Sequence, residues 1–199
     1  MTAAPSSPDL PLKQRLKNGH VPVGTMVFEF FVPGMAQMAR AVGADFLMYD
    51  TEHSGVDIEA IKAQCAACNG TGVVPLVRVP GFHYHFVARA LDAGAHGIMM
   101  PMVADAEQAR ALVSWSRYPP LGRRGQCGRH CRCGRCRCAV DRIVAAARRH
   151  GKTAAVMAGD EAWARRYHGL GFRMFAYGLD AQLFQRALAA GIGAVRALA

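Results

Sequence analysis

The apolar residues of this chain form short runs that alternate with amphipathic stretches. From Val21 onward, strand-like runs are each followed by a helix-like stretch. The predicted strands cover residues 22–30, 45–53, 73–79, 96–103, 152–158 and 172–180. Because these runs lack polar alternation, they indicate strands buried on both faces, and repeated strand–helix pairs indicate a parallel sheet with right-handed crossovers. The pattern therefore predicts an α/β fold.

Six strand–helix pairs suit two architectures. One is a (β/α)₈ TIM barrel that lacks part of its middle, since such barrels have eight pairs in about 250 residues and this chain has 199. The other is a complete doubly wound sheet of about six strands. Periodicity does not separate them, although no G-x-G-x-x-G motif opens a helix after a strand, which disfavours a dinucleotide-binding sheet.

The chain is organised as one domain after a short arm. Residues 1–11 are rich in Pro, Ser and Ala and predict a flexible N-terminal arm, whereas residues 12–199 predict a single domain that is interrupted at 121–139. The N-terminus lacks a basic region followed by an apolar one, and no apolar run approaches the length of a membrane span. We therefore expect a cytoplasmic protein that does not bind membranes.

The interruption is a segment rich in arginine and cysteine, "RGQCGRHCRCGRCRCAVD", at residues 124–141. Between Leu121 and Arg142 there are seven arginines and a single acid, Asp141, so this stretch supplies more than half of the net charge of +10. It also contains five of the seven cysteines. The charge is thus local, and the rest of the chain is nearly balanced.

Three interpretations of this segment compete. Its thiols are numerous enough for one zinc ion, but the spacing does not present two separated C-x₂₋₄-C pairs. Its charge suits phosphate contacts, but it has no aromatic residue for base stacking. The third interpretation, which we favour, is a scar left by a deletion or a frame error in a GC-rich gene, because Arg, Cys, Gly and Ala are what such DNA encodes out of frame. We therefore expect no nucleic-acid partner.

Polar residues at the ends of two predicted strands are candidates for chemistry. Asp50, Glu52 and His53 leave the strand at 45–53, and two carboxylates beside an imidazole can orient its tautomer and raise its basicity. Arg78 ends the strand at 73–79 and offers a planar cation for a carboxylate or an enolate oxygen. In parallel folds these strand ends open into one crevice. Asp92, near a helix end, is by itself more typical of a solvated or capping carboxylate.

At these residues the chain resembles a known family. The segments "YDTEH", "VRVP", "ALDAGAHGIMMPMV" and "SRYPPLGRRG", in this order, are similar to the HpcH/HpaI-type class II pyruvate aldolases. The resemblance covers residues 12–125 and 139–199. It implies a TIM barrel, commonly in a homo-oligomer, that makes or breaks a carbon–carbon bond of a small keto acid. In this family a divalent ion (Mg²⁺, Mn²⁺ or Co²⁺) holds the pyruvate enolate.

The resemblance also assigns roles to the catalytic candidates. His53 would move the proton of the aldol hydroxyl, and Asp92 would be the carboxylate paired with it. Arg78 would bind the pyruvate carboxylate or keto oxygen and stabilise the enolate.

Supporting and metal-binding positions follow in the same way. Asp50 and Glu52 would support the His53 loop, and Arg124 would lie near the site. The family's metal ligands, a Glu after the fifth strand and an Asp after the sixth, have no counterpart here, so no metal ligand is assigned. We therefore expect a barrel that lacks its fifth and sixth βα units and has low aldolase activity. Two alternatives are an inactive βα scaffold whose Arg/Cys segment binds zinc or nucleic acid, and another lyase or isomerase of the pyruvate/phosphoenolpyruvate barrels.

Overall fold

The computed structural model of the chain describes residues 11–118, 120–124 and 137–198. The predicted arm, apart from Pro11, lies outside the described residues. So do residues 125–136, which carry most of the Arg/Cys segment together with its zinc and nucleic-acid interpretations. The remaining chain shows how the two halves flanking that segment are arranged.

The described residues form a parallel six-stranded sheet with helices between the strands. The strands are β1 (Val23–Val27), β2 (Phe46–Asp50), β3 (Val74–Arg78), β4 (Gly97–Met99), β5 (Ala155–Ala158) and β6 (Met174–Leu179). The helices are α1 (Leu12–Lys17), α2 (Met35–Ala41), α3 (Ile58–Ala67), α4 (Tyr84–Asp92), α5 (Ala106–Trp115), α6 (Arg137–Arg149), α7 (Glu161–Gly169) and α8 (Asp180–Arg196). Each strand lies within one of the six ranges expected from the sequence, so the strand pattern is confirmed.

The order of the strands distinguishes the two architectures. The sheet runs β4-β3-β2-β1-β6-β5, and every neighbouring pair is parallel. Each crossover, from β1 to β4 and again from β5 to β6, moves along the sheet in the same direction. A doubly wound sheet reverses this direction at its switch point, whereas a barrel does not. The fold is therefore a singly wound half-barrel, with β4 and β5 as its edges among the described strands.

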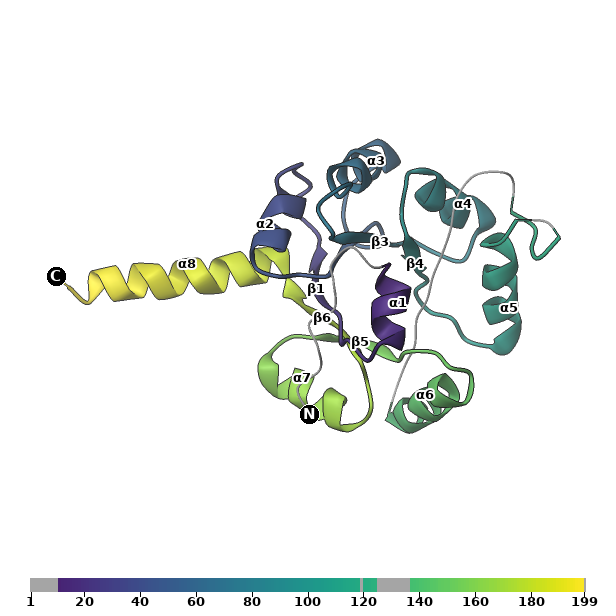
Figure 1. Cartoon of the computed structure of the whole chain (residues 1–199). Coiled ribbons are helices and arrows are strands. Elements are labelled where there is room, and N and C mark those ends of the chain that lie inside the picture. The colour runs from purple at the N-terminus through teal and green to yellow at the C-terminus, as the bar shows by residue number, and fades with distance from the viewer. Residues whose placement is uncertain (1–10, 119, 125–136, 199) are drawn as a thin grey trace.

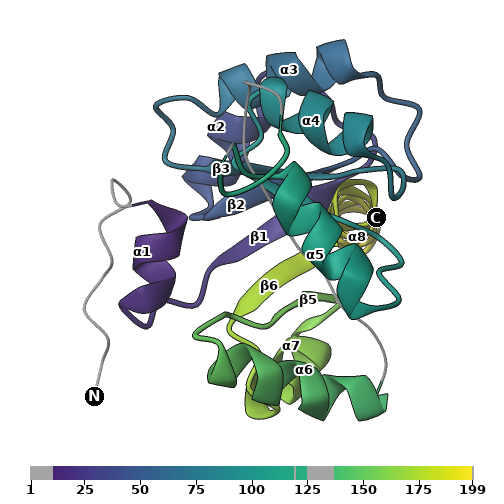
Figure 2. The same cartoon turned by 90° about the vertical axis from the view of Figure 1, so that its right-hand side faces the viewer.

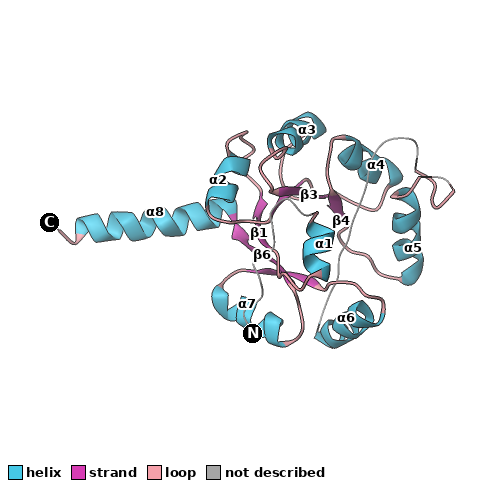
Figure 3. Cartoon of the chain, in the orientation of Figure 1, coloured by secondary structure: helices cyan, strands magenta, loops and turns pink. Residues whose placement is uncertain are grey.

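Single winding places the βα helices on one face of the sheet. Figures 1 and 3 show α2 to α7 around the outside of the strands, while α8 projects away from them. The main core lies between sheet and helices, where Leu47 and Tyr49 of β2 pack with Ile61 of α3 and Val87 of α4. A smaller core joins β5 and β6 to α6 and α7.

The other face of the sheet is concave and less well covered. Met26, Phe46 and Ala176 are buried there, whereas Met48 and Leu76 are only partly buried. In a closed barrel, side chains from opposite strands fill this interior. Among the described strands, β4 and β5 form the two edges of the sheet and do not pair with each other.

Helix α1 lies where the strands begin (Figure 2). Its buried Arg15 forms an ion pair with Asp45, immediately before β2. Asp45 also accepts hydrogen bonds from His20 Nε2 at 2.8 Å and from the backbone of Val23 at 2.9 Å. This network ties α1 to the end of the sheet where the strands begin. The opposite end, where the strands finish, is therefore left for a site. No helix in the described parts of the chain combines the length and the apolar character that a bilayer span requires.

Candidate active site

The carboxyl ends of β2 and β3 bring two oppositely charged residues together. Asp50 and Arg78 are direct neighbours in the parallel register, two residues beyond the concave-face pair Met48 and Leu76. Since side chains alternate along a strand, Asp50 and Arg78 also face the concave side. Arg78 Nε donates to Asp50 Oδ1 at 2.5 Å, and the Asp50 side chain is fully buried.

Asp50 also shapes the loop that follows its strand. Its carboxylate accepts hydrogen bonds from the backbone of Glu52 at 3.2 Å and of His53 at 2.7 Å. Its carbonyl accepts one from the Ser54 hydroxyl at 2.5 Å. The loop folds back over its own strand end because a buried carboxylate needs such donors.

Arg78 is held from three directions. Besides Asp50, its Nη1 lies 3.0 Å from Glu52 Oε2, and its guanidinium carbon lies 5.4 Å from the centre of the Phe28 ring. The side chain retains 14% of its accessible surface. A cation fixed in this way, with part of its side chain still exposed, suits a planar carboxylate or an enolate.

His53 forms the exposed rim of this group. Its side chain is 64% exposed, and its Nε2 lies 3.7 Å from Glu52 Oε2. Glu52 thus lies between a fixed guanidinium and an accessible imidazole. An imidazole beside a carboxylate can accept and return a proton near neutral pH.

The two remaining predicted site residues lie elsewhere. Asp92 is the last residue of α4, and its Oδ1 accepts a hydrogen bond from Arg124 Nη2 at 2.5 Å. The helix of a βα unit runs back along the sheet, so its C-terminal end lies near the amino ends of the strands. His53 follows the carboxyl end of β2. Among the described residues, Asp92 forms its ion pair with Arg124, and His53 lies 3.7 Å from Glu52.

The structure adds a residue that sequence reasoning missed. Asp180, the first residue of α8, is 4% exposed and binds the backbone of the loop after β1. Nothing in the pattern of residues 172–180 signals this contact, because it depends on β6 lying beside β1.

The helix-side face of β2 is chemically inert. The Tyr49 hydroxyl lies 3.6 Å from Cys68 Sγ. Burial raises the pKa of Tyr49 and of Cys68 above their ordinary values, and it raises the pKa of Cys65 to about 12. Thiols that stay protonated are poor nucleophiles and poor metal ligands, so these cysteines belong to the core.

The residues of the site do not fit a divalent ion. The Asp50 carboxylate is occupied by Arg78 and by two backbone N–H groups, and Glu52 is paired with Arg78. A hard dication needs several oxygen ligands. Across the described ranges, no group of three or more His, Cys, Asp or Glu side chains is arranged to hold one.

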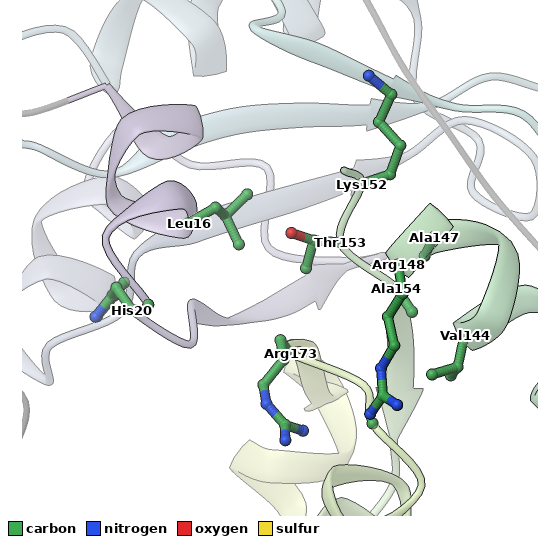
Figure 4. Close-up of a pocket in the computed structure, with 11 residues that line it drawn as sticks. Leu16, His20, Val144, Ala147, Arg148, Lys152, Thr153, Ala154 and Arg173 are labelled. Atoms are coloured by element: carbon green, nitrogen blue, oxygen red, sulfur yellow. The ribbon is translucent and has the colours of Figure 1, made fainter. Parts of the chain in front are cut away.

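A hollow of about 300 Å³ lies between α1 and the C-terminal end of α6, and its lining does not include Arg78 (Figure 4). His20, Arg148, Lys152 and Arg173 contribute positive or titratable groups to its lining. In Figure 4 Lys152 and Arg173 point in opposite directions, and Arg173 Nη1 donates to the carbonyls of His168 and Phe172. Basic side chains near the C-terminal end of a helix normally donate hydrogen bonds to its last carbonyls. The basic groups of this hollow therefore do not by themselves indicate a ligand. We therefore place the candidate site at Arg78.

Comparisons with known proteins find relatives among 2-oxo acid aldolases. The chain is 40% identical over 114 residues to a 4-hydroxy-2-oxovalerate aldolase of Novosphingobium aromaticivorans, covering 57% of this chain and 43% of the relative. It is 36% identical over 115 residues to a 2-keto-3-deoxy-L-rhamnonate aldolase of Escherichia coli, covering 58% and 43%. The chain thus spans less than half the length of these curated relatives.

A solved structure shares the fold. The HpcH/HpaI aldolase from Desulfitobacterium hafniense superposes with a TM-score of 0.84 at 23% identity, over 93% of this chain and 96% of that one. The sequence profile of HpcH/HpaI aldolase/citrate lyase matches residues 26–135. That stretch includes β2 and β3 with the Asp50–Arg78 pair and makes up more than half of the chain. On this evidence the chain belongs to the HpcH/HpaI aldolase/citrate lyase family.

Proposed function

We propose that this chain is a carbon–carbon lyase derived from the 2-oxo acid aldolases, which cleave 4-hydroxy-2-oxo or 2-keto-3-deoxy acids to pyruvate and an aldehyde. Its family membership and the names of its relatives support the reaction class. One observation carries the proposal: Asp50 and Glu52 hold Arg78 at a strand end, and the exposed imidazole of His53 lies beside Glu52.

The reaction assigns a role to each of these groups. His53 takes the proton of the aldol hydroxyl while the carbon–carbon bond breaks. The electron pair of that bond enters the pyruvate half, which becomes an enolate. Arg78 binds the carboxylate or keto oxygen of that half and stabilises the enolate charge. Glu52 and Asp50 orient the imidazole and the guanidinium. The enolate then takes up a proton and leaves as pyruvate.

Asp92 and Arg124 have a different place in the proposal. The resemblance makes Asp92 the carboxylate partner of His53 and places Arg124 near the site. Their mutual pair supports instead a structural link between the C-terminal end of α4 and the loop that follows α5. Both assignments from the resemblance stay predictions.

We also propose that the chain lacks two βα units of an ancestral barrel. The strand order opens between β4 and β5, where the fifth and sixth units of an eight-stranded barrel would stand. The Arg/Cys segment occupies this point in the chain. In the family the metal ligands come from those two units, and the described residues do not replace them. Without a metal the enolate loses its main Lewis acid, so we propose that turnover is low.

A homo-oligomer is the third part of the proposal. Helix α8 carries a stripe of exposed apolar residues (Phe184, Leu188, Ile192 and Val195), and the helix projects away from the half-barrel (Figure 1). Such a stripe marks an interaction surface, and a second copy of the chain suits the oligomers known in the family. A cytoplasmic location stays a prediction.

An assay of aldol cleavage tests the function. With a 2-keto-3-deoxy sugar acid and Mg²⁺, we expect pyruvate release at less than roughly 0.1 s⁻¹, compared with roughly 1–1,000 s⁻¹ for ordinary enzymes. Oxalate, a planar analogue of the enolate, should still bind. Arg78→Lys should weaken oxalate binding about tenfold because the planar fork is lost, and Arg89→Lys on the exposed face of α4 serves as the matched control. An ordinary turnover rate would contradict the impairment, and equal oxalate binding by both variants would contradict the site.

A further inference from the structure

A buried carboxylate joins the last helix to the loop that follows the first strand. Asp180 Oδ2 accepts hydrogen bonds from three successive backbone N–H groups, those of Phe28 at 3.1 Å, Glu29 at 2.9 Å and Phe30 at 2.8 Å. Its Oδ1 accepts a fourth, from the backbone of Ala181, at 2.8 Å. Three adjacent N–H groups that converge on one oxygen form a local anion-binding concavity, and here the protein fills it with its own carboxylate.

The loop held in this way carries a wall of the candidate site. The centre of the Phe28 ring lies 5.4 Å from the guanidinium carbon of Arg78, which Asp50 and Glu52 also contact. The Phe30 ring contacts Phe184 of α8 edge-on at 5.7 Å, which ties the same loop to α8 a second time. Arg78 is therefore held both by carboxylates of β2 and its loop and by an aromatic ring of the loop after β1. The position of that ring depends on residues 28–30.

We propose that Asp180 is a positioning residue of the Arg78 site. It fixes the backbone of residues 28–30 and thereby keeps the Phe28 ring against the guanidinium, which limits the directions in which Arg78 can present its donors. This inference rests on the proposed function and deepens it. Without the carboxylate, three amide dipoles would lose their acceptor at a partly buried position, and the loop would turn to find other partners.

The first test is spectroscopic and does not require a ligand. In Asp180→Asn, we expect faster amide hydrogen exchange at residues 28–30 and a shifted Arg78 Nε–H resonance, because the Phe28 ring current moves. The matched control is Asp105→Asn, since Asp105 also accepts from backbone N–H groups but caps only its own helix, α5. Both signals should stay unchanged in the control. An Arg78 resonance identical in wild type and Asp180→Asn would overturn the proposal.

The second test is a double-mutant cycle on oxalate binding. We expect Asp180→Asn and Phe28→Leu each to weaken binding about tenfold, and the double variant to bind no worse than Phe28→Leu, since Asp180 acts through the ring. Additive losses, or unchanged binding by Phe28→Leu, would contradict the proposal, and Phe28→Leu provides this test even if Asp180→Asn fails to fold. If the wild type does not bind oxalate, the proposed function fails, whereas the resonance of Arg78 still decides the role of Asp180.

Discussion

At the scale of single residues, the candidate site depends on charges that neighbouring strand ends hold in place. Asp50 is fully buried, yet its charge is compensated by Arg78 and by the backbone N–H groups of its own loop. Removing one member of such a set usually costs more than the pair itself contributes, because the partner stays buried without compensation. Asp50 and Arg78 could be recognised in the sequence for a different reason. Each lies at the end of a strand-like run, and in a parallel fold such ends come together.

Cys65 gives a prediction that depends on pH. Burial and the neighbouring Cys68 raise its pKa from the ordinary 9.0 to about 12, so the unfolded chain loses this proton before the folded chain does. Stability should therefore fall between pH 9 and about 12, at up to roughly 1.4 kcal/mol per pH unit. Urea unfolding at pH 9.0 and 10.5 should show a loss larger by about 1–2 kcal/mol in wild type than in Cys65→Ala. Parallel losses in the two proteins would refute this account.

At the scale of elements, close strand contact decides which side chains fit. Gly24 of β1 is paired with Phe46 of β2, and a Cβ atom at Gly24 would lie 2.1 Å from the Phe46 carbonyl oxygen. The glycine thus allows β1 to lie beside β2 while the Phe46 ring fills the concave face. The sequence predicts both strands but not this contact, because register is set by pairing in three dimensions.

We expect Gly24→Ala to destabilise the chain by at least about 3 kcal/mol, since the clash involves backbone and a buried ring. Gly169→Ala, at the exposed end of α7 where no atom lies within 4 Å of an added Cβ, should leave stability unchanged or raise it by less than about 1 kcal/mol. Urea-induced unfolding followed by circular dichroism measures both changes. Similar stabilities for the two variants would show that β1 and β2 pair less closely than the structure shows.

At the scale of the whole molecule, the half-barrel leaves surfaces that a closed barrel would cover. The edges of the described sheet are β4 and β5, and part of the concave face is exposed. Open edges and apolar stripes favour association. Helix α8 adds the exposed side chains of Leu188 and Ile192.

Association through α8 can be tested by charge substitution on two of its faces. The pair Leu188→Glu and Ile192→Glu should reduce self-association at least about tenfold, because two buried apolar contacts would be replaced by like charges. The pair Gln182→Glu and Ala190→Glu changes the net charge equally on the opposite face of the helix and should have little effect. Sedimentation equilibrium measures both. If the two double variants dissociate the protein equally, added charge and not the apolar stripe of α8 controls assembly.

The sequence by itself determined the strands, the helices and the residues at the strand ends, because each depends on a local pattern of apolar residues and on the chain direction of a parallel fold. It left open whether the sheet is singly or doubly wound, since both have the same periodicity. Only the tertiary structure decided that β6 lies beside β1. That neighbourhood brings Asp180 to the loop of Phe28 and leaves β4 and β5 as the edges of the described sheet, while a separate long-range contact pairs Asp92 with Arg124. These contacts join residues that are distant in sequence, and no local pattern records which distant segments meet.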